Sequence, residues 1–385
     1  MEREKTEYIR EDHLVSTTDG WKIYIKRYKP HKYLPVPVVL CHGVGANGYS
    51  LDLYGDEEDD LWKRYSLAYY LLSGGKDKEI KFDVWVPELR GRKASQTFHP
   101  VYYPQKYNWN VDTYIDHDVP DIVNYIKQVY YNEGYPDAKL LWVGKSMGGM
   151  IAYAYGMTEP GKRFLKGVVT ISSPIRFENV GKECGIIFKA IKKIHPRKKS
   201  FPVAWIKILR MIGYEEILKK NICNIENIDE KILQDYIDKG ADNTLSLKIF
   251  LQFLYFIKLG YFCRYPQHPW LCDLFQKIPI LRKLVRPYSY KDHINEFKIP
   301  VLMITGGGDK LAPPEEISYV CNHIGTKEED KECIIFSVTD DTPGTCDYGH
   351  LDINYGEKAK EEVYPFIYKW LKERCKEVIN EVDFV

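Results

Sequence analysis

A short stretch from Lys139 to Gly149 constrains the fold of this chain more than any other part of its sequence. The apolar run Leu140 to Val143 leads directly into G-K-S-M-G at positions 144–148, and apolar residues then recur at helical spacing. Glycines on both sides of Ser146 permit a turn that is too tight for a Cβ at either position. The stretch therefore predicts a strand, a sharp turn and a helix, with Ser146 exposed at the apex, as in the G-x-S-x-G nucleophile elbow.

An ordinary turn between a strand and a helix is the alternative explanation of this pattern, because glycine and serine are common residues. The five-residue pattern alone does not separate the two explanations. A serine nucleophile also needs a general base, an acid that orients the base, and hydrogen-bond donors for a negatively charged intermediate. The rest of the chain must supply these groups at suitable places.

The remainder of the chain alternates between short apolar runs and amphipathic stretches. Predicted strands lie at 38–41, 82–86, 140–143, 167–171, 301–305 and 332–336, after a predicted N-terminal hairpin at 13–29. Predicted helices lie at 61–72, 111–132, 315–323 and 358–377, in addition to the helix that follows Ser146. This alternation indicates an α/β protein with a mostly parallel, doubly wound sheet that carries helices on both faces.

The alternation stops between Pro174 and Lys298. Helical patterns with proline and glycine breaks fill this segment, so we predict an all-helical insertion at 174–298 within a core made of 1–173 and 299–385. The insertion follows a strand that ends near Ser173. It should therefore cover the carboxyl ends of the strands and form a cap, or lid, above Ser146.

The predicted cap has an uneven composition. It holds 23 Lys and Arg against 13 Asp and Glu, although the whole chain has a net charge of only +1. A basic stretch at 192–199 and an apolar stretch at 245–262 suggest two hypotheses, which are transient contact with an anionic membrane surface and the lining of an apolar pocket. A basic helix face in water is favoured over membrane contact. Pocket lining and simple burial against the core both stay open.

Two polar residues follow predicted strands downstream of Ser146. Asp309 lies in a glycine-rich loop after strand 301–305, and His350 lies in the loop after strand 332–336. Reactive groups of a doubly wound sheet collect beyond the carboxyl ends of its strands. We therefore predict that His350 takes the proton of Ser146 and returns it to the leaving group, while Asp309 orients the imidazole.

Other candidates for these roles are weaker. Asp341 lies on the same loop as His350, and Asp352 lies two residues beyond the histidine, so Asp309 is the better-placed acid. Cys346 is close to His350 but has no elbow around it that would make it a nucleophile. His42, at the end of strand 38–41, is interpreted as a structural residue.

The loop after the first buried strand is the predicted source of an oxyanion hole. Its sequence, H-G-V-G at 42–45, is too rich in glycine for a helix or strand, and the glycines allow the backbone amides to turn inward. We assign one donor to the N–H of Met147, which follows the nucleophile, and the second to the N–H of Val44.

No cofactor or metal is expected from the sequence. The three glycines at 306–308 match no nucleotide-binding pattern, and the D-H-D residues at 116–118 would diverge on a helix. The balanced charge argues against nucleic acid as a partner, so the expected partner is a small ester or lipid. Nine cysteines without metal-like spacing, and no apolar N-terminal segment, make a cytoplasmic protein with reduced thiols the expectation.

With these residues identified, the chain resembles the α/β-hydrolase superfamily and, within it, the acid-lipase-like esterase and lipase branch. The resemblance rests on the opening hairpin at 19–28, the H-G-V loop, the strand and loop at 82–91, the helix at 114–122, the elbow at 144–149 and the D-Y-G-H-L-D loop at 347–352. The order Ser146, Asp309, His350 along the chain is also that of α/β-hydrolases. The resemblance implies the same triad and the same oxyanion donors, Val44 and Met147.

The chain departs from this branch in two ways. Lys145 stands where the branch often has His or Tyr, and no secretion signal precedes the hairpin. The expected function is a serine hydrolase that cleaves carboxylic esters through an acyl-enzyme. An acyltransferase with the same triad is one alternative, and a non-catalytic protein that binds lipid or another ligand on this fold is another.

Overall fold

A computed structural model describes residues 8–376 and 378, except 54–59, 77, 181–200, 212, 214, 276, 277, 279, 280, 282 and 340. Its centre is an eight-stranded sheet in the order β1-β2-β4-β3-β5-β6-β9-β10. The strands are β1 Tyr8–Ser16, β2 Lys22–Pro30, β3 Pro37–Cys41, β4 Asp83–Glu88, β5 Leu140–Lys145, β6 Leu165–Ile171, β9 Val301–Gly306 and β10 Lys331–Phe336.

Parallel pairing dominates the sheet. β1 and β2 form the predicted antiparallel hairpin, and β2 also runs antiparallel to β4. All other neighbouring strands run parallel, and β5, which precedes Ser146, lies between β3 and β6 in the middle. The predicted fold class, a mostly parallel α/β sheet, is therefore confirmed.

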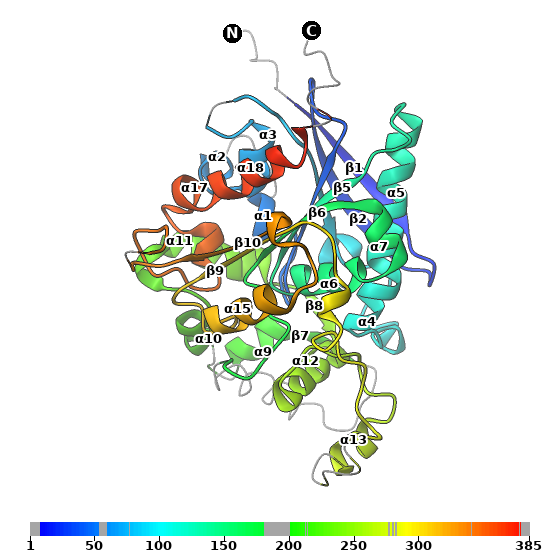
Figure 1. Ribbon diagram of the computed structural model, residues 1–385. Helices are drawn as coiled ribbons and strands as arrows, with labels where there is room; N and C mark the ends of the chain where they lie inside the picture. The colour runs from blue at the N-terminus through cyan, green and yellow to red at the C-terminus, as the bar shows by residue number, and fades with distance from the viewer. Residues whose placement is uncertain are drawn as a thin grey trace.

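Helices cover both faces of this sheet (Figure 1). One face packs against α5, α6 and α15, and the other packs against α2, α3, α17 and α18. Successive side chains of β5 point to opposite faces of the sheet. Leu140 and Trp142 pack in the core on the first face, and Leu141 and Val143 pack in the core on the second. The bounds of these helices are α2 Asp60–Tyr65, α3 Leu67–Leu72, α5 Val119–Asn132, α6 Met147–Gly156, α15 Pro314–His323, α17 Ala359–Glu362 and α18 Tyr364–Glu373.

Three predicted helices need refinement. The predicted helix 61–72 breaks at Ser66, whose side chain accepts the N–H of Tyr69 and so caps α3. The predicted helix 111–132 begins as α4, Val111–Thr113, and passes through a π-helical turn, η4 Tyr114–Asp118, into α5. Pro120 falls in the first turn of α5, where its missing N–H costs little. The predicted helix 358–377 divides into α17 and α18 within the described residues.

The segment between β6 and β9 contains a feature that the sequence analysis missed. Besides its helices it contains a short antiparallel pair, in which Val203 faces Leu245. The prediction of an all-helical insertion was therefore wrong, because strands of three residues carry too little alternation to be recognised. The elements are β7 Pro202–Ala204, α9 Trp205–Met211, α10 Glu215–Ile222, α11 Glu230–Asp235, β8 Thr244–Ser246, α12 Leu247–Leu259 and α13 Pro269–Phe275.

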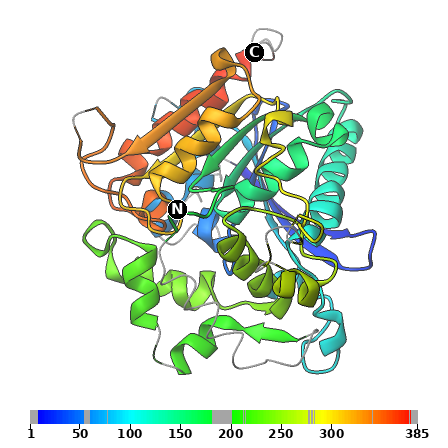
Figure 2. The ribbon, with the colours of Figure 1, turned by 60° about the horizontal axis from the view of Figure 1, so that its bottom comes forward.

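These elements gather at one end of the sheet, as the turned view shows (Figure 2). The basic stretch at 192–199 lies outside the described residues. The boundaries of the insertion at 174 and 298 stay a prediction.

Candidate active site

Ser146 occupies the tight turn that the sequence predicts. It is the N-cap of α6, and its backbone angles, φ 53° and ψ −118°, lie in a region that residues other than glycine rarely adopt. Its side chain makes no capping hydrogen bond, so the hydroxyl stays available. A Cβ on Gly144 would lie 2.4 Å from the carbonyl carbon of Gly148, and a Cβ on Gly148 would lie 2.2 Å from the carbonyl oxygen of Cys41. The strain at Ser146 is thus held by packing that only glycine allows.

His350 and Asp309 meet beyond the ends of β9 and β10. The Nδ1 atom of His350 lies 2.8 Å from Oδ2 of Asp309, although the residues are 41 positions apart. The other carboxylate oxygen, Oδ1, accepts the backbone N–H groups of Leu311 and Ala312, both at 2.8 Å. Both oxygens of Asp309 are therefore used, and the carboxylate holds the imidazole in a fixed orientation with Nδ1 protonated.

The charges of this pair follow from burial and from each other. Burial alone would raise the pKa of Asp309, but the charge and hydrogen bond of His350 outweigh it and lower the pKa to about 2. Burial lowers the pKa of His350, an effect that Asp309 opposes and Lys145 reinforces. The imidazole is consequently neutral near pH 7, which leaves Nε2 free to accept a proton.

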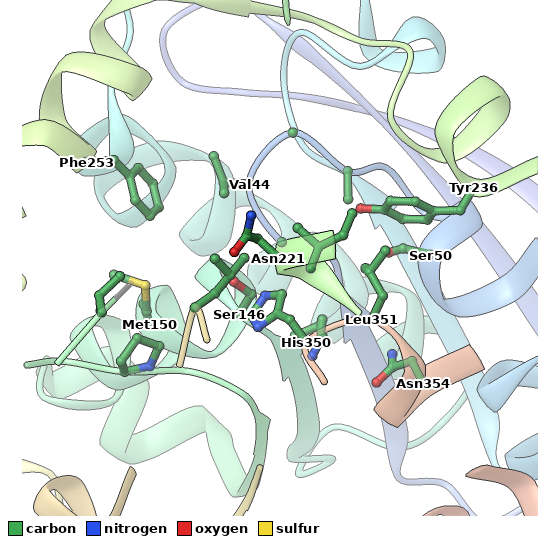
Figure 3. Close-up of a pocket in the computed structure, with 18 of the residues that line it drawn as sticks. Val44, Ser50, Ser146, Met150, Asn221, Tyr236, Phe253, His350, Leu351 and Asn354 are labelled. Carbon is green, nitrogen blue, oxygen red and sulfur yellow. The ribbon is translucent and has the colours of Figure 1, made fainter. Parts of the chain in front are cut away.

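The loop after β3 packs directly against the nucleophile. A Cβ on Gly43 would lie 3.1 Å from Cβ of Ser146, so only a glycine lets the loop come this close without displacing the serine. Gly45 has a φ of +73°, and its carbonyl oxygen accepts the indole N–H of Trp205 from α9. Met147 is the first residue of α6, so its N–H has no acceptor within the helix. Figure 3 shows that Val44 and Ser146 line the same pocket.

Known proteins resemble this chain in sequence and in fold. A family model for the alpha/beta hydrolase fold matches residues 36–188. The esterase of Exiguobacterium antarcticum superposes with a TM-score of 0.54 at 15% sequence identity, over 95% of this chain and 100% of that one. The chain has the α/β-hydrolase fold.

Its sequence relatives include proteins that are named as lipases. Triacylglycerol lipase 1 of Arabidopsis thaliana is 20% identical over 96% of this chain and 88% of its own length. Lipase member M of Homo sapiens is 22% identical over 82% of this chain and 74% of its own length. These relatives support carboxylic ester hydrolysis as the general activity of this α/β-hydrolase.

The other candidate residues have different hydrogen-bond partners or surroundings. Asp352 does not orient the imidazole, because its oxygens accept the N–H groups of Gly349 and Asn224. His42 is fully buried and its Nε2 accepts the N–H of Leu89, which agrees with a structural role. Burial raises the pKa of the Cys346 thiol, which does not favour a thiolate nucleophile.

Lys145 is an unusual neighbour for the nucleophile. Its side chain is only 4% exposed, and within the described part of the chain its Nζ atom has no hydrogen-bond partner. Burial lowers its pKa to about 8, although the carboxylates of Asp309 and Asp352 oppose this shift. A buried cation thus lies close to the acid of the predicted triad, and it strengthens the bias of His350 toward the neutral state.

A mostly apolar cavity of about 140 Å³ opens over Ser146 and His350. Core and insertion line it together (Figure 3). Its apolar walls include Val44, Met150, Pro174, Phe177, Val180, Trp205, Ile222, Phe250, Phe253, Ile257, Leu311 and Leu351. Its polar side chains include Ser50, Lys145, Asn221, Tyr236, Asn354 and Tyr355.

The insertion is also tied to the loop that carries His350. The N–H of Leu351 donates to the carbonyl of Ile222 at 2.7 Å. The side-chain amide of Asn227 donates to the carbonyl of Asp347 at 3.1 Å and to Oδ2 of Asp352 at 3.0 Å, and Asn224 also donates to both residues. No local sequence pattern indicates these contacts, because they join the insertion to a loop more than a hundred residues away.

Among the residues that the structure describes, no group of three or more His, Cys, Asp and Glu side chains could hold a metal ion. Within the same residues, no helix combines the length and the hydropathy needed to cross a membrane.

Proposed function

We propose that this α/β-hydrolase is a serine esterase that cleaves carboxylic esters through an acyl-enzyme. The observation that carries the proposal is the 2.8 Å contact between His350 and Asp309 in the pocket that also contains Ser146. A serine hydroxyl needs an oriented general base to act as a nucleophile near neutral pH, and a neutral imidazole held by a carboxylate is such a base.

The reaction would proceed in two steps, which are acylation of Ser146 and hydrolysis of the acyl-enzyme. Ser146 Oγ attacks the ester carbonyl carbon while His350 Nε2 takes its proton, and the negative charge moves to the carbonyl oxygen. The N–H groups of Val44 and Met147 would stabilise that oxygen, and each such donor typically contributes about 10²–10³ in rate. The bond to the alcohol oxygen then breaks, and His350 returns the proton to the alcohol. A water molecule then attacks the acyl-enzyme carbonyl carbon while His350 takes its proton. His350 returns the proton to Ser146 Oγ, and the carboxylic acid is released.

The cavity favours an ester with an apolar acyl group. Its walls are mostly aliphatic and aromatic, and burying a chain there removes apolar surface from water at about 25 cal/mol for each Å². The insertion would act as the cap of this pocket, since Phe250, Phe253 and Ile257 of α12 all line it. Pocket lining is therefore the role that we propose for the apolar stretch at 245–262.

An assay with p-nitrophenyl esters of graded chain length, combined with labelling by a fluorophosphonate, tests the proposal. We expect hydrolysis of medium-chain esters and covalent labelling at Ser146. The Ser146→Ala variant should lose about 10⁶-fold in kcat and all labelling. Ser73→Ala, which changes a serine at the C-cap of α3, is the matched control. Undiminished hydrolysis by a folded Ser146→Ala protein would refute the assignment and favour a binding protein on this fold.

A further inference from the structure

Two cysteines outside the candidate active site face each other between α15 and the strand β10. Ile334 and Phe336 of β10 pack in the core on the far face of the sheet, so Cys333, which alternates with them, points toward α15. Cys321 lies on α15 four residues after the buried Ile317, and therefore on the helix face that packs against the sheet. Both cysteines pack against the same hydrophobic core. The helix and the strand thus bring together two thiols that are 12 positions apart in the chain.

The two thiol groups are hydrogen-bonded to each other. This contact lowers the pKa of the Cys321 thiol and raises the pKa of the Cys333 thiol, so the S–H group of Cys333 donates to the sulfur of Cys321. Partial burial opposes the lowered pKa of Cys321, the charge of Lys331 reinforces it, and the carboxylate of Glu328 opposes it more weakly. Lys331 lies two positions before Cys333, on the same face of the strand. Cys321 is therefore the more nucleophilic member of the pair.

Exposure and acidity separate this pair from the other described cysteines. Cys321 and Cys333 are only partly buried, so a small oxidant can reach them. Burial instead raises the pKa of the other thiols for which a shift is resolved and keeps them in the less reactive protonated form, namely Cys41, Cys223, Cys263, Cys346 and Cys375.

The thiol pair lies away from the predicted triad. Cys333 is opposite Met303 in the middle of β9, whereas Asp309 follows the carboxyl end of that strand. α15 runs back from the loop of Asp309 toward the other end of the sheet, where Thr326 donates to the carbonyl of Ile299 just before β9. A covalent bond between the two sulfurs would therefore leave the acid and the base in place.

The strand that carries Cys333 is the last strand of the sheet. β10 pairs with β9 on one side, and no described strand pairs with its other side. Edge strands have one row of backbone groups without a strand partner, so they are less firmly held than central strands. A bond from Cys333 to α15 would add a covalent attachment to this edge.

We propose that Cys321 and Cys333 form a redox-active pair, which a hydroperoxide converts into a disulfide that clamps the edge strand β10 to α15. The sulfur of Cys321 attacks one oxygen of hydrogen peroxide, the O–O bond breaks, and a sulfenic acid and a hydroxide ion form. The sulfur of Cys333 then attacks the sulfenic sulfur, and the departing hydroxide takes the Cys333 proton and leaves as water. Two thiols are oxidised to one disulfide while one peroxide is reduced to two water molecules.

Peptide mapping of the oxidised protein tests the bond. The folded protein would be treated with excess hydrogen peroxide, its remaining thiols blocked with N-ethylmaleimide, and the product digested with trypsin. We expect peptides 311–327 and 332–358 to be joined, and dithiothreitol to separate them. A Cys321 that stays a free thiol, becomes a sulfinic acid or joins a different cysteine would overturn the pair.

Variants identify the partner of Cys321. Peptide 332–358 also contains Cys346, so Cys346→Ser is the matched control and should keep the cross-link. Cys333→Ser should lose the cross-link and leave Cys321 open to further oxidation. A cross-link that survives in Cys333→Ser but disappears in Cys346→Ser would also overturn the assignment.

The melting temperature measures the clamp. Closing this short loop should raise the melting temperature of the wild-type and Cys346→Ser proteins by about 3 °C, and peroxide should cause no rise in Cys321→Ser or Cys333→Ser. A cross-linked protein whose melting temperature does not rise would overturn the clamp. Neither measurement depends on ester hydrolysis, so both test the pair even if the protein has no esterase activity.

Discussion

Asp309 divides its two carboxylate oxygens between His350 and its own loop. Oδ2 lies 2.8 Å from Nδ1 of His350, while Oδ1 accepts the backbone N–H groups of Leu311 and Ala312. The loop thereby fixes the rotamer of the acid, and the acid fixes the imidazole. A carboxylate held at both oxygens loses little conformational entropy when the imidazole becomes charged during the reaction.

Asp309→Asn should therefore remove activity without disturbing the loop. An asparagine side chain can still accept the loop N–H groups through its oxygen, but its NH₂ group faces Nδ1 and forces the imidazole into the wrong tautomer. We expect kcat for p-nitrophenyl hexanoate to fall by about 10⁴-fold with little change in melting temperature. A variant that retains a tenth or more of the activity would show that another group orients His350.

The buried charge of Lys145 should set the acid limb of the pH profile. The pKa of His350 is lowered by burial and by Lys145, against the opposing effect of Asp309 and a weaker one of Asp352. Because the neutral imidazole is the active base, kcat/KM should rise with pH through a midpoint below the usual histidine value of about 6.5.

Lys145→Met removes one of the two influences that lower the pKa of His350. The midpoint of the acid limb should then move to higher pH, by about half a unit or more. The exposed Lys139, which directly precedes the strand that ends at Lys145, provides the matched control Lys139→Met, which should leave the midpoint in place. If both variants give the wild-type midpoint, Lys145 does not influence the base.

The glycines of the elbow provide a stability test. A Cβ on Gly148 would lie 2.2 Å from the carbonyl oxygen of Cys41, which belongs to the neighbouring strand β3 and cannot move alone. Gly148→Ala should lower the free energy of unfolding by about 3 kcal/mol or more, measured by urea denaturation. Gly134, by contrast, has a positive φ, +94°, and nothing lies within 4 Å of its Cβ position, so Gly134→Ala should cost only about 1–2 kcal/mol. Gly148 has no positive φ, so a loss no larger than that of Gly134→Ala would show that the neighbouring strand yields to the added methyl group.

Local patterns were sufficient to predict the elbow and the positions of the main strands along the chain. G-K-S-M-G between an apolar run and a helical pattern has one simple structural solution, and parallel strands bring their carboxyl ends to one edge. Asp309 and His350 could therefore be paired from their positions after two strands. Their contact is short because β9 and β10 are neighbours in the sheet.

The insertion and the polar side chains of the cavity could not be predicted in the same way. Val203 and Leu245 pair across 42 positions in strands of three residues, which give no periodic signal. Ser50 and Asn354 are ordinary polar residues in the sequence, and their burial at a cavity depends on how distant helices pack. The sequence analysis identified Lys145 as a departure from the family pattern. Its Nζ atom has no hydrogen-bond partner among the described residues because of how the loops around it pack, which no sequence pattern predicts.

The contact between the insertion and the histidine loop yields the last prediction. Asn227 donates to Asp347 and Asp352 on either side of His350, so the insertion helps to hold the loop that positions the base. Asn227→Ala removes both hydrogen bonds and should lower kcat by about tenfold, with a smaller change in KM, because small displacements of a catalytic group are costly. Asn132→Ala, which removes an exposed amide contact on α5, serves as the control and should retain wild-type kcat. If Asn227→Ala lowers the melting temperature but leaves kcat unchanged, the contact supports the fold and has no part in positioning His350.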